Sequence, residues 1–183
     1  MLCGKLLCVS HIIKSNWFRT SKEVFVRTFV TIYRSEIGPL EIVGSSKGIL
    51  TLTFVEDELE ADRNLPACMT ECLRQLDEYF KGRRQKFSVP MILNGTEFQK
   101  AVWRQLEKIP FGQTASYGDV ARAVGSPRAF RAVGNANNKN NIPIIIPCHR
   151  VIGSDGKMVG FGSGIWRKEW LLDHEKAFDR NKT

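Results

Sequence analysis

The sequence predicts an α+β fold: a small antiparallel sheet with one helix in the amino-terminal half, followed by a mostly helical, winged-helix-like unit built on a helix-turn-helix. Three observations predict this order. Residues 25–54 are rich in Val, Ile, Thr and Phe and are broken by turn residues, residues 66–82 carry apolar side chains at helical spacing, and two short helical patterns flank Gly125. The chain of 183 residues is 43% hydrophobic, enough to bury a core.

The amino-terminal half is predicted to form an α/β domain over residues 25–87, preceded by an extension, residues 1–24. Turn residues divide the strand-rich part of this domain into three short runs, as expected of a small antiparallel sheet. The turn residues are Gly38, Pro39, Ser45, Ser46 and Gly48.

One helix is expected to pack on this sheet. Pro66 begins it and Gly82 ends it, since proline suits the first turn of a helix and glycine suits the position after the last turn. Between them, apolar residues recur at helical spacing at Met69, Leu73, Leu76 and Phe80. Cys68 and Cys72 lie four residues apart on the same helix, where buried core thiols fit better than a metal pair.

Residues 88–95 are expected to be a linker into a second domain, residues 96–183. Thr96 can cap a helix that Ile109-Pro110 ends, because a threonine side chain accepts a hydrogen bond from the first turn and the residue before proline disfavours helical geometry. The side chains that this helix is expected to turn toward the core are Phe98, Val102, Trp103 and Leu106.

A helix-turn-helix is predicted around Gly125. Ser116 followed by Asp119 is a variant of the capping box and begins the first helix, while Ser126 is expected to cap the second, with Pro127 as its first residue. The second helix carries two arginines among small residues: Arg128, Ala129, Arg131, Ala132 and Gly134. This composition favours close packing on a DNA backbone with little reading of base sequence. On spacing alone, an αα-hairpin inside a core explains the pattern equally well.

The net charge of +8 is concentrated in the carboxyl-terminal half. Residues 1–95 carry 13 basic and 11 acidic side chains, whereas residues 96–183 carry 14 and 8. Within residues 117–150, five basic side chains accompany one acidic one, Asp119, a balance that suits contact with phosphates. A solvated basic surface is the alternative explanation of the charge alone.

The five cysteines favour reduced thiols over a disulfide framework, because their number is odd and their spacing irregular. Cys3, Cys8 and His11 lack the spacing of a zinc finger and a clear fourth ligand, so no metal site is predicted. The sequence contains neither a signal-peptide pattern nor an apolar stretch of membrane-spanning length. We therefore expect a cytoplasmic location, or a nuclear one in a eukaryote, and no membrane partner.

The segment around Cys148 carries the candidate chemistry. Pro143 and Pro147 frame an apolar run that is expected to be buried and extended, and Pro147 would hold the backbone just before the thiol. His149 and Arg150 place hydrogen-bonding and cationic groups beside the cysteine, which can favour a nucleophilic thiolate. A buried structural cysteine with an incidental histidine explains the same adjacency, since neighbouring side chains diverge.

The pentapeptide Pro-Cys-His-Arg-Val at residues 147–151 resembles the signature of the O6-alkylguanine-DNA alkyltransferases, also called methylated-DNA–protein-cysteine methyltransferases. The resemblance covers nearly all of residues 98–175, whereas residues 25–86 resemble the variable amino-terminal domain of the family only weakly. Outside the pentapeptide the matching positions are Trp103, Ser116-Tyr117-Gly118, Arg131-Ala132-Val133-Gly134, Asn140, Ile152-Gly153, Gly160, Lys168, Leu171-Leu172 and Glu175.

The resemblance implies that the Cys148 thiolate attacks the alkyl carbon of O6-alkylguanine in DNA, with O4-alkylthymine left open as a second substrate. The resulting thioether would not be cleaved, so each molecule would act once. His149 would accept the thiol proton through a water, with Glu175 orienting its imidazole. Asn140 would fix the surrounding loop. The hydroxyl of Tyr117 would ease departure of the base, with Lys168 near that hydroxyl.

The same resemblance implies contacts with DNA and with the substrate. Arg131 would fill the place of a flipped nucleotide, because the alkyl carbon cannot be reached inside the base stack. The implied DNA contacts are Ser116, Tyr117, Arg128, Ala129 and Arg131. The implied substrate pocket is Val151, Phe161, Gly162 and Ser163. Damaged double-stranded DNA is itself the alkyl donor, so no cofactor is expected, and the protein is expected to act as a monomer.

Two other classes of protein stay open on the sequence. One is a lesion-binding or regulatory DNA protein that performs no transfer, although relatives of that kind lack the cysteine that this chain retains. The other is a cysteine hydrolase, which would turn over through an acyl intermediate. Reaction stoichiometry separates the three, since only the alkyltransferase consumes one protein molecule for each lesion.

Overall fold

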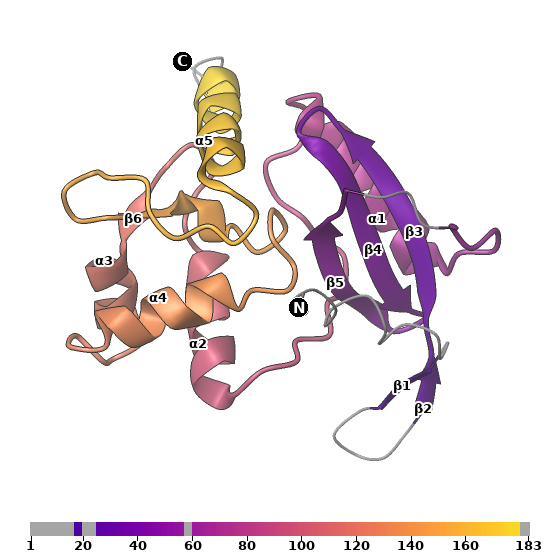
Figure 1. Ribbon diagram of the computed structural model, residues 1–183, viewed down its shortest axis with the longest axis horizontal. Coiled ribbons are helices and arrows are strands. Elements are labelled where there is room, and N and C mark those ends of the chain that lie inside the picture. The colour runs from indigo at the N-terminus through magenta and orange to yellow at the C-terminus, as the bar shows by residue number, and fades with distance from the viewer. Residues whose placement is uncertain (1–16, 20–24, 57–59, 180–183) are drawn as a thin grey trace, which may run out of the picture.

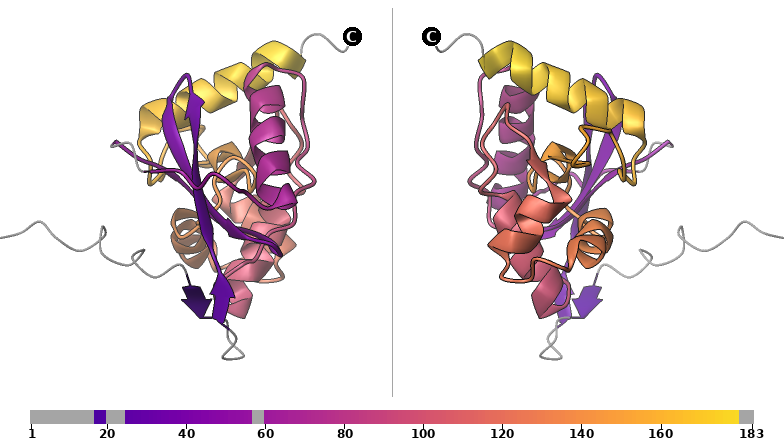
Figure 2. Two further views of the ribbon diagram at one scale, coloured as in Figure 1. Left: turned by 90° about the vertical axis from the view of Figure 1, so that its right-hand side faces the viewer. Right: turned by 90° about the vertical axis from the view of Figure 1, so that its left-hand side faces the viewer.

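The computed structural model describes residues 17–19, 25–56 and 60–179. A sheet backed by one helix lies beside a group of shorter helices, and a long extended segment connects the two halves (Figure 1). The last helix, α5 (Ile165–Asp179), lies across the end of α1 (Ala67–Phe80) in both side views (Figure 2). The α+β class expected from the sequence is confirmed.

Three antiparallel strands form the main sheet, in the order β3 (Phe29–Ser35), β4 (Gly38–Ser45) and β5 (Gly48–Phe54). Gly38 and Gly48 stand at the two tight turns with φ of +111° and +151°, a conformation that side chains disfavour. The run that begins at Phe25 also contains a further strand, β2 (Phe25–Arg27). It pairs with β1 (Trp17–Arg19) as a separate two-stranded sheet.

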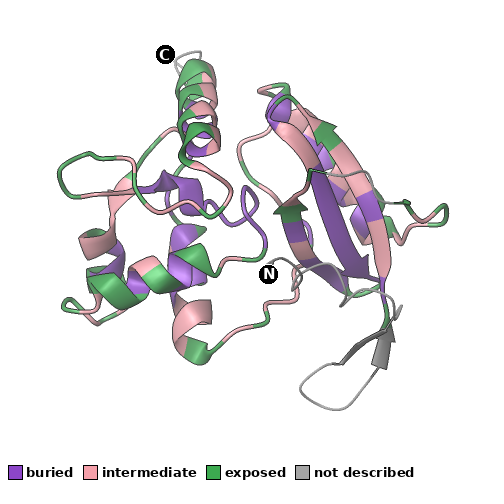
Figure 3. Cartoon of the chain, viewed as in Figure 1, coloured by how far each residue is buried: buried purple, intermediate pink, exposed green. Residues whose placement is uncertain are grey.

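The main sheet buries one face against α1. Leu40, Ile42 and Leu52 are fully buried there, because alternate residues of a strand point to the same face and Ile42 stands opposite Leu52. Gly44 lets the helix come close, since a Cβ at this position would lie 3.0 Å from the side chain of Met69. The central strand β4 is buried along most of its length (Figure 3).

The ends of α1 lie where the sequence predicts them. Pro66 directly precedes the first helical residue, and Gly82 closes the helix with its N–H bonded to the carbonyl of Tyr79. Gly82 has φ of +69°, and a Cβ there would come within 2.1 Å of the Phe178 ring, so only glycine fits. Cys72 on the inner face of the helix is fully buried.

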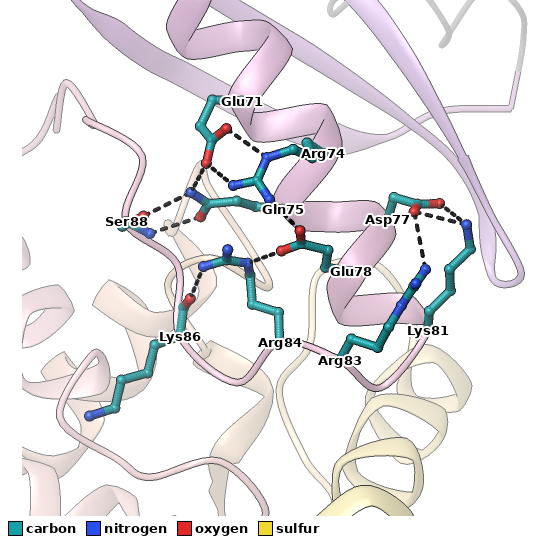
Figure 4. A network of polar contacts seen from close by, with 10 residues as sticks. All are labelled: Glu71, Arg74, Gln75, Asp77, Glu78, Lys81, Arg83, Arg84, Lys86 and Ser88. Atoms are coloured by element: carbon teal, nitrogen blue, oxygen red, sulfur yellow. Dashed lines mark hydrogen bonds and ion pairs between the residues drawn. The ribbon is translucent and has the colours of Figure 1, made fainter.

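Polar contacts bind α1 to the chain that leaves it (Figure 4). The amide of Gln75 donates to the Ser88 hydroxyl at 2.8 Å and accepts from the Ser88 N–H at 2.8 Å. Arg84 donates to Glu78 at 2.7 Å and to the carbonyl of Lys86 at 2.9 Å. These bonds satisfy the buried Gln75 side chain and set the direction of the chain toward the second half.

The segment expected as a linker runs along the edge of β5. The Ile49 N–H donates to the Pro90 carbonyl at 2.9 Å, and the Ile92 N–H donates to the Ile49 carbonyl at 2.8 Å. Thr96 then caps α2 (Glu97–Leu106) in a full capping box with Gln99, as the sequence predicts for Thr96. On the inner face of α2 the buried side chains are Val102, Trp103 and Leu106.

The helix-turn-helix consists of α3 (Tyr117–Ala123) and α4 (Phe130–Asn138). The predicted capping box of Ser116 with Asp119 is present at the start of α3. The predicted cap at Ser126 is wrong. Its carbonyl accepts the Ala129 N–H at 2.8 Å and closes a separate turn, so the helix begins only at Phe130, and Arg128 and Ala129 lie in the turn before it.

The remaining elements bring Cys148 between the helix pair and α5. A short parallel pairing joins β6 (Ala115–Ser116) to β7 (Val151–Ile152), and the 3₁₀ turn η1 (Cys148–Arg150) directly precedes β7. Among the described residues, no helix is both long and apolar enough to cross a membrane.

Candidate active site

The backbone before Cys148 forms a compact loop. The predicted apolar run is buried from Ile142 to Ile146, but the prediction that it is extended is wrong. Ile144 has φ of +74°, and the Ile146 N–H returns to the Ile142 carbonyl at 2.9 Å. Asn140 closes the loop from the side, since its amide accepts from the Ile142 N–H at 3.0 Å and donates to the Ile146 carbonyl at 2.9 Å.

Pro147 sets the position of the cysteine. Its φ of −80° and ψ of 62° are those of an inverse γ-turn, which the Cys148 N–H closes by donating to the Ile146 carbonyl at 2.8 Å. Proline is restricted to a φ in this range, so the turn costs little conformational entropy. Cys148 lies at the start of η1 and is 4% exposed.

His149 and Glu175 form a buried pair beside this thiol. His149 Nε2 lies 2.7 Å from Glu175 Oε1, and both side chains are fully buried. Glu175 is an acceptor, so Nε2 carries the proton and the lone pair of the neutral imidazole lies on Nδ1. The structure gives this buried Nδ1 no hydrogen-bond partner among the described residues.

Three further donors hold the Glu175 carboxylate. Arg150 donates to both oxygens at 2.9 Å, the Tyr79 hydroxyl donates to Oε1 at 2.9 Å, and the Gly112 N–H donates to Oε2 at 3.1 Å. Burial raises the pKa of this carboxyl, but the hydrogen bonds from His149 and Arg150 and the charge of Arg150 outweigh it and hold the pKa well below the usual range. Glu175 is therefore an anion that orients the imidazole.

The thiol and the imidazole are both held neutral. Burial raises the pKa of Cys148 to about 11, against the opposing effects of a hydrogen bond from Asn140 and the charge of Lys168. Burial also lowers the pKa of His149, although Glu175 acts in the opposite direction. A thiol with so high a pKa needs a base in order to react near neutral pH, and a neutral imidazole can supply one.

Lys168 and Tyr117 meet at one backbone carbonyl. The Lys168 ammonium donates to the carbonyls of Val151 and Val159 at 2.6 and 2.7 Å, and the Tyr117 hydroxyl donates to Val159 at 3.0 Å. Burial lowers the pKa of Lys168 to about 8. Burial is the main cause that raises the pKa of Tyr117, and a thiolate at Cys148 raises it further, so the Tyr117 hydroxyl stays protonated and can donate.

A cavity of about 40 Å³ lies beside Cys148. Asn140, Phe161, Gly162 and Ser163 line it among others, so the structure brings these predicted residues together. Val151 does not line it, because this side chain is fully buried on β7 and its carbonyl faces Lys168. The cavity is small compared with ordinary ligand sites of roughly 300–1,000 Å³.

The predicted DNA contacts lie on the helix pair. Arg131 is exposed on α4, and its guanidinium lies 5.7 Å from the ring centre of Phe130, which is itself 49% exposed. Arg128 is exposed and Ala129 half-buried in the preceding turn. Ser116 uses its hydroxyl in the capping box of α3, so its side chain is already engaged within the protein.

Sequence reasoning did not include Tyr79, Gly112 or Phe130 in the site. Tyr79 and Gly112 stand 96 and 63 residues before Glu175, and no spacing rule connects them to it. Arg150 was noted only as a neighbour of Cys148, whereas it is the charged partner of Glu175. The sequence signal that could have indicated this role of Arg150 was the presence of an arginine inside an otherwise apolar, buried segment. Cys3, Cys8 and His11 lie outside the described residues.

Comparisons with known proteins show the family of this chain. Two family models match, "6-O-methylguanine DNA methyltransferase, ribonuclease-like domain" over residues 28–93 and "6-O-methylguanine DNA methyltransferase, DNA binding domain" over residues 97–177. A methylated-DNA–protein-cysteine methyltransferase of Methanosarcina barkeri is 44% identical over 155 residues, which are 81% of this chain and 97% of the relative. The chain belongs to this methyltransferase family.

Other members of the family are similar to the same extent. The methyltransferase of Mycobacterium leprae is 47% identical over 146 residues, covering 78% of this chain and 88% of the relative. The crystal structure of the Mycobacterium tuberculosis O6-methylguanine methyltransferase has a TM-score of 0.74 at 43% identity, covering 82% and 93% of the two chains. The structure of that mycobacterial methyltransferase with DNA has a TM-score of 0.73 at 43% identity and covers 80% and 92%.

Proposed function

We propose that this methyltransferase repairs DNA by transferring a methyl or other alkyl group from O6 of guanine to Cys148 in one irreversible step. The observation that carries the proposal is the buried Cys148 thiol next to His149, whose imidazole is held by the Glu175 carboxylate. Membership of the family supports the class of reaction. The arrangement supplies a nucleophile, a base and the group that orients the base.

The chemistry follows from the protonation states. His149 Nδ1 takes the thiol proton through a water, and the imidazolium that forms is stabilised by Glu175. The sulfur then forms a bond to the alkyl carbon while the bond from that carbon to O6 breaks, and its electron pair goes to the guanine. In this proposal the Tyr117 hydroxyl leaves the Val159 carbonyl, to which it donates in the free protein, and donates to the departing base. The thioether that forms is a stable product, so the thiol is not regenerated in this proposal.

Double-stranded DNA binds to the helix pair in this proposal. The exposed side chains of Arg128 and Arg131 contact DNA phosphates or enter the base stack. Ser116, Tyr117 and Ala129 pack on the sugar-phosphate backbone of the DNA. Little sequence specificity is expected from so few long side chains. The nucleotide must be flipped out, at a cost of a few kcal/mol that these contacts offset. The protein acts as a monomer in the cytoplasm, or in the nucleus of a eukaryotic cell.

The substrate pocket in this proposal is the cavity beside Cys148. Phe161, Gly162 and Ser163 line this cavity, and in this proposal their backbone amides donate to O6 of the departing guanine, while Asn140 keeps the loop that carries the cysteine in position. Val151 contributes through its carbonyl, which fixes the Lys168 ammonium.

Intact-protein mass spectrometry tests the proposal. The protein is incubated with an equimolar duplex carrying one O6-methylguanine, and the expected product has exchanged one hydrogen for one methyl group on the peptide that contains Cys148. Cys148→Ser should abolish the mass change while still binding the duplex, because serine is a far weaker nucleophile in the same position. Cys68→Ser, which removes a half-buried thiol from α1, is the matched control and should leave transfer intact.

Stoichiometry decides against the other classes of protein. One methyl group per protein molecule, with no further repair when lesions are in excess, is the expected result. Repair of many lesions per molecule without a mass change would refute the proposal in favour of a hydrolase. Tight binding without repair would refute it in favour of a lesion-binding protein.

A further inference from the structure

The roof of the Cys148 cavity is a short segment held at both ends by side chains. Residues 160–163 line the cavity, and the carbonyl of Val159 at one end accepts from Tyr117 and Lys168. At the other end, the carbonyl of Ser163 accepts from Arg167 Nη1 at 2.7 Å. The first anchor, at the Val159 carbonyl, is formed by residues of the candidate active site. The second has no part in the chemistry.

Arg167 connects that second anchor to the amino-terminal sheet. Its Nε donates to the carbonyl of Ile37, in the turn between β3 and β4, at 2.9 Å. The guanidinium carbon lies 4.5 Å from the ring centre of Phe54 at the end of β5, and 4.5 Å from that of Trp166. A Cβ at Gly38 would come within 3.2 Å of Arg167 Nη2, so the guanidinium packs closely against this turn.

These contacts immobilise the arginine well. A guanidinium presents its donors in a rigid fork and its faces to aromatic rings, and here both properties are used. Two backbone carbonyls from distant parts of the chain accept from the same side chain. Movement of Ser163 away from the cavity therefore requires that the hydrogen bond to Arg167 breaks, or that Arg167 leaves its place on the sheet.

We propose that Arg167 limits the size of the alkyl group that Cys148 can accept, by fixing the Ser163 end of the roof to the amino-terminal sheet. This inference rests on the proposed alkyl transfer. The cavity of about 40 Å³ must widen to take the base with either group, and it must widen further for a benzyl group than for a methyl group. Loss of the anchor lowers the barrier for the larger group more than for the smaller one. Arg167 is a positioning residue, since it touches neither Cys148 nor the cavity.

The test compares two duplexes that differ only in an O6-methyl or O6-benzyl group on one guanine. Single-turnover rate constants are measured for the wild type and for Arg167→Met, which keeps the length of the side chain and removes its donors and charge. Since two hydrogen bonds to the anchor are lost, the ratio of benzyl to methyl rate is expected to rise by about tenfold. A ratio that stays unchanged or falls, whatever the absolute rates, overturns the proposal.

Two further variants keep the test decisive. Phe54→Leu removes the aromatic face on the sheet side without touching the cavity, and should raise the ratio in the same direction by a smaller factor. Lys176→Met removes a positive charge from an exposed position of the same helix and should leave the ratio unchanged. If Arg167→Met does not fold, as judged by circular dichroism, Phe54→Leu decides alone. Absence of any transfer by the wild type would refute the proposed function, and transfer with an unchanged ratio would refute only the role of Arg167.

Discussion

Tyr79→Phe is expected to change the active site from a position on the amino-terminal domain. The Tyr79 hydroxyl is fully buried and donates to Glu175 Oε1 at 2.9 Å, the same oxygen that lies 2.7 Å from His149 Nε2. Phenylalanine keeps the ring and its packing against Phe111 and His174, and removes only this donor. The substitution therefore isolates a single hydrogen bond to the Glu175 carboxylate.

The size of the effect follows from the charge of the acceptor. A hydrogen bond to a charged group contributes about 1.5–3 kcal/mol to stability. Glu175 keeps its bonds to His149, Arg150 and Gly112, so the lower end of this range, about 1.5 kcal/mol, is expected for Tyr79→Phe. The carboxylate that has lost this donor also attracts the proton of His149 more strongly, so the pKa of His149 rises toward its ordinary value.

Two measurements check both consequences. Urea unfolding gives the loss of stability, and the single-turnover rate as a function of pH gives the acid limb on which His149 becomes protonated. Because burial holds the pKa of His149 below 6.5 in the wild type, that limb lies below pH 6.5 and should move upward in Tyr79→Phe. Tyr33→Phe removes a hydroxyl from the same domain but none of the donors to Glu175, and is the matched control. An unmoved limb together with unchanged stability would refute the reasoning.

Three further predictions concern the ion pair, the end of α1 and the DNA surface. Glu175→Gln leaves the buried Arg150 unpaired, so urea unfolding should show a loss of about 3–5 kcal/mol. Because the pKa of Glu175 is depressed in the folded protein, its ionised carboxylate stabilises the fold above pH 4.5, and this stabilisation is lost as the pH falls. The free energy of unfolding of the variant should therefore lack this dependence on acid pH. Gly82→Ala should destabilise by at least about 1–2 kcal/mol in the same assay, because φ is +69° and the new Cβ meets Phe178. Arg131→Ala should lower the fluorescence of a 2-aminopurine flipped in place of the lesion; an unchanged signal would contradict its role in flipping.

Local sequence determined the parts of the fold that depend on neighbouring residues. Thr96 and Ser116 cap their helices because the bonding partner of each lies three residues away, and the sequence shows both members of each pair. Gly82 ends its helix for an equally local reason. The prediction was wrong at Ser126, where a helix cap competes with a local turn. The turn that ends at Ala129 forms in place of a capped helix. Local composition also failed to predict the apolar run before Pro147. Its residues favour a strand, whereas the backbone bends at Ile144.

The sequence by itself determined which residues could react, and the tertiary structure decided how they are held. Cys148 and His149 are adjacent in the chain, and their chemistry could be recognised from that adjacency and from the resemblance around it. Tyr79 and Arg167 could not be found in this way, because their partners at Glu175 and Ile37 lie 96 and 130 residues away. Contacts of that kind arise only when the two halves pack together, since burial of apolar surface brings distant residues into reach and sequence spacing does not record it.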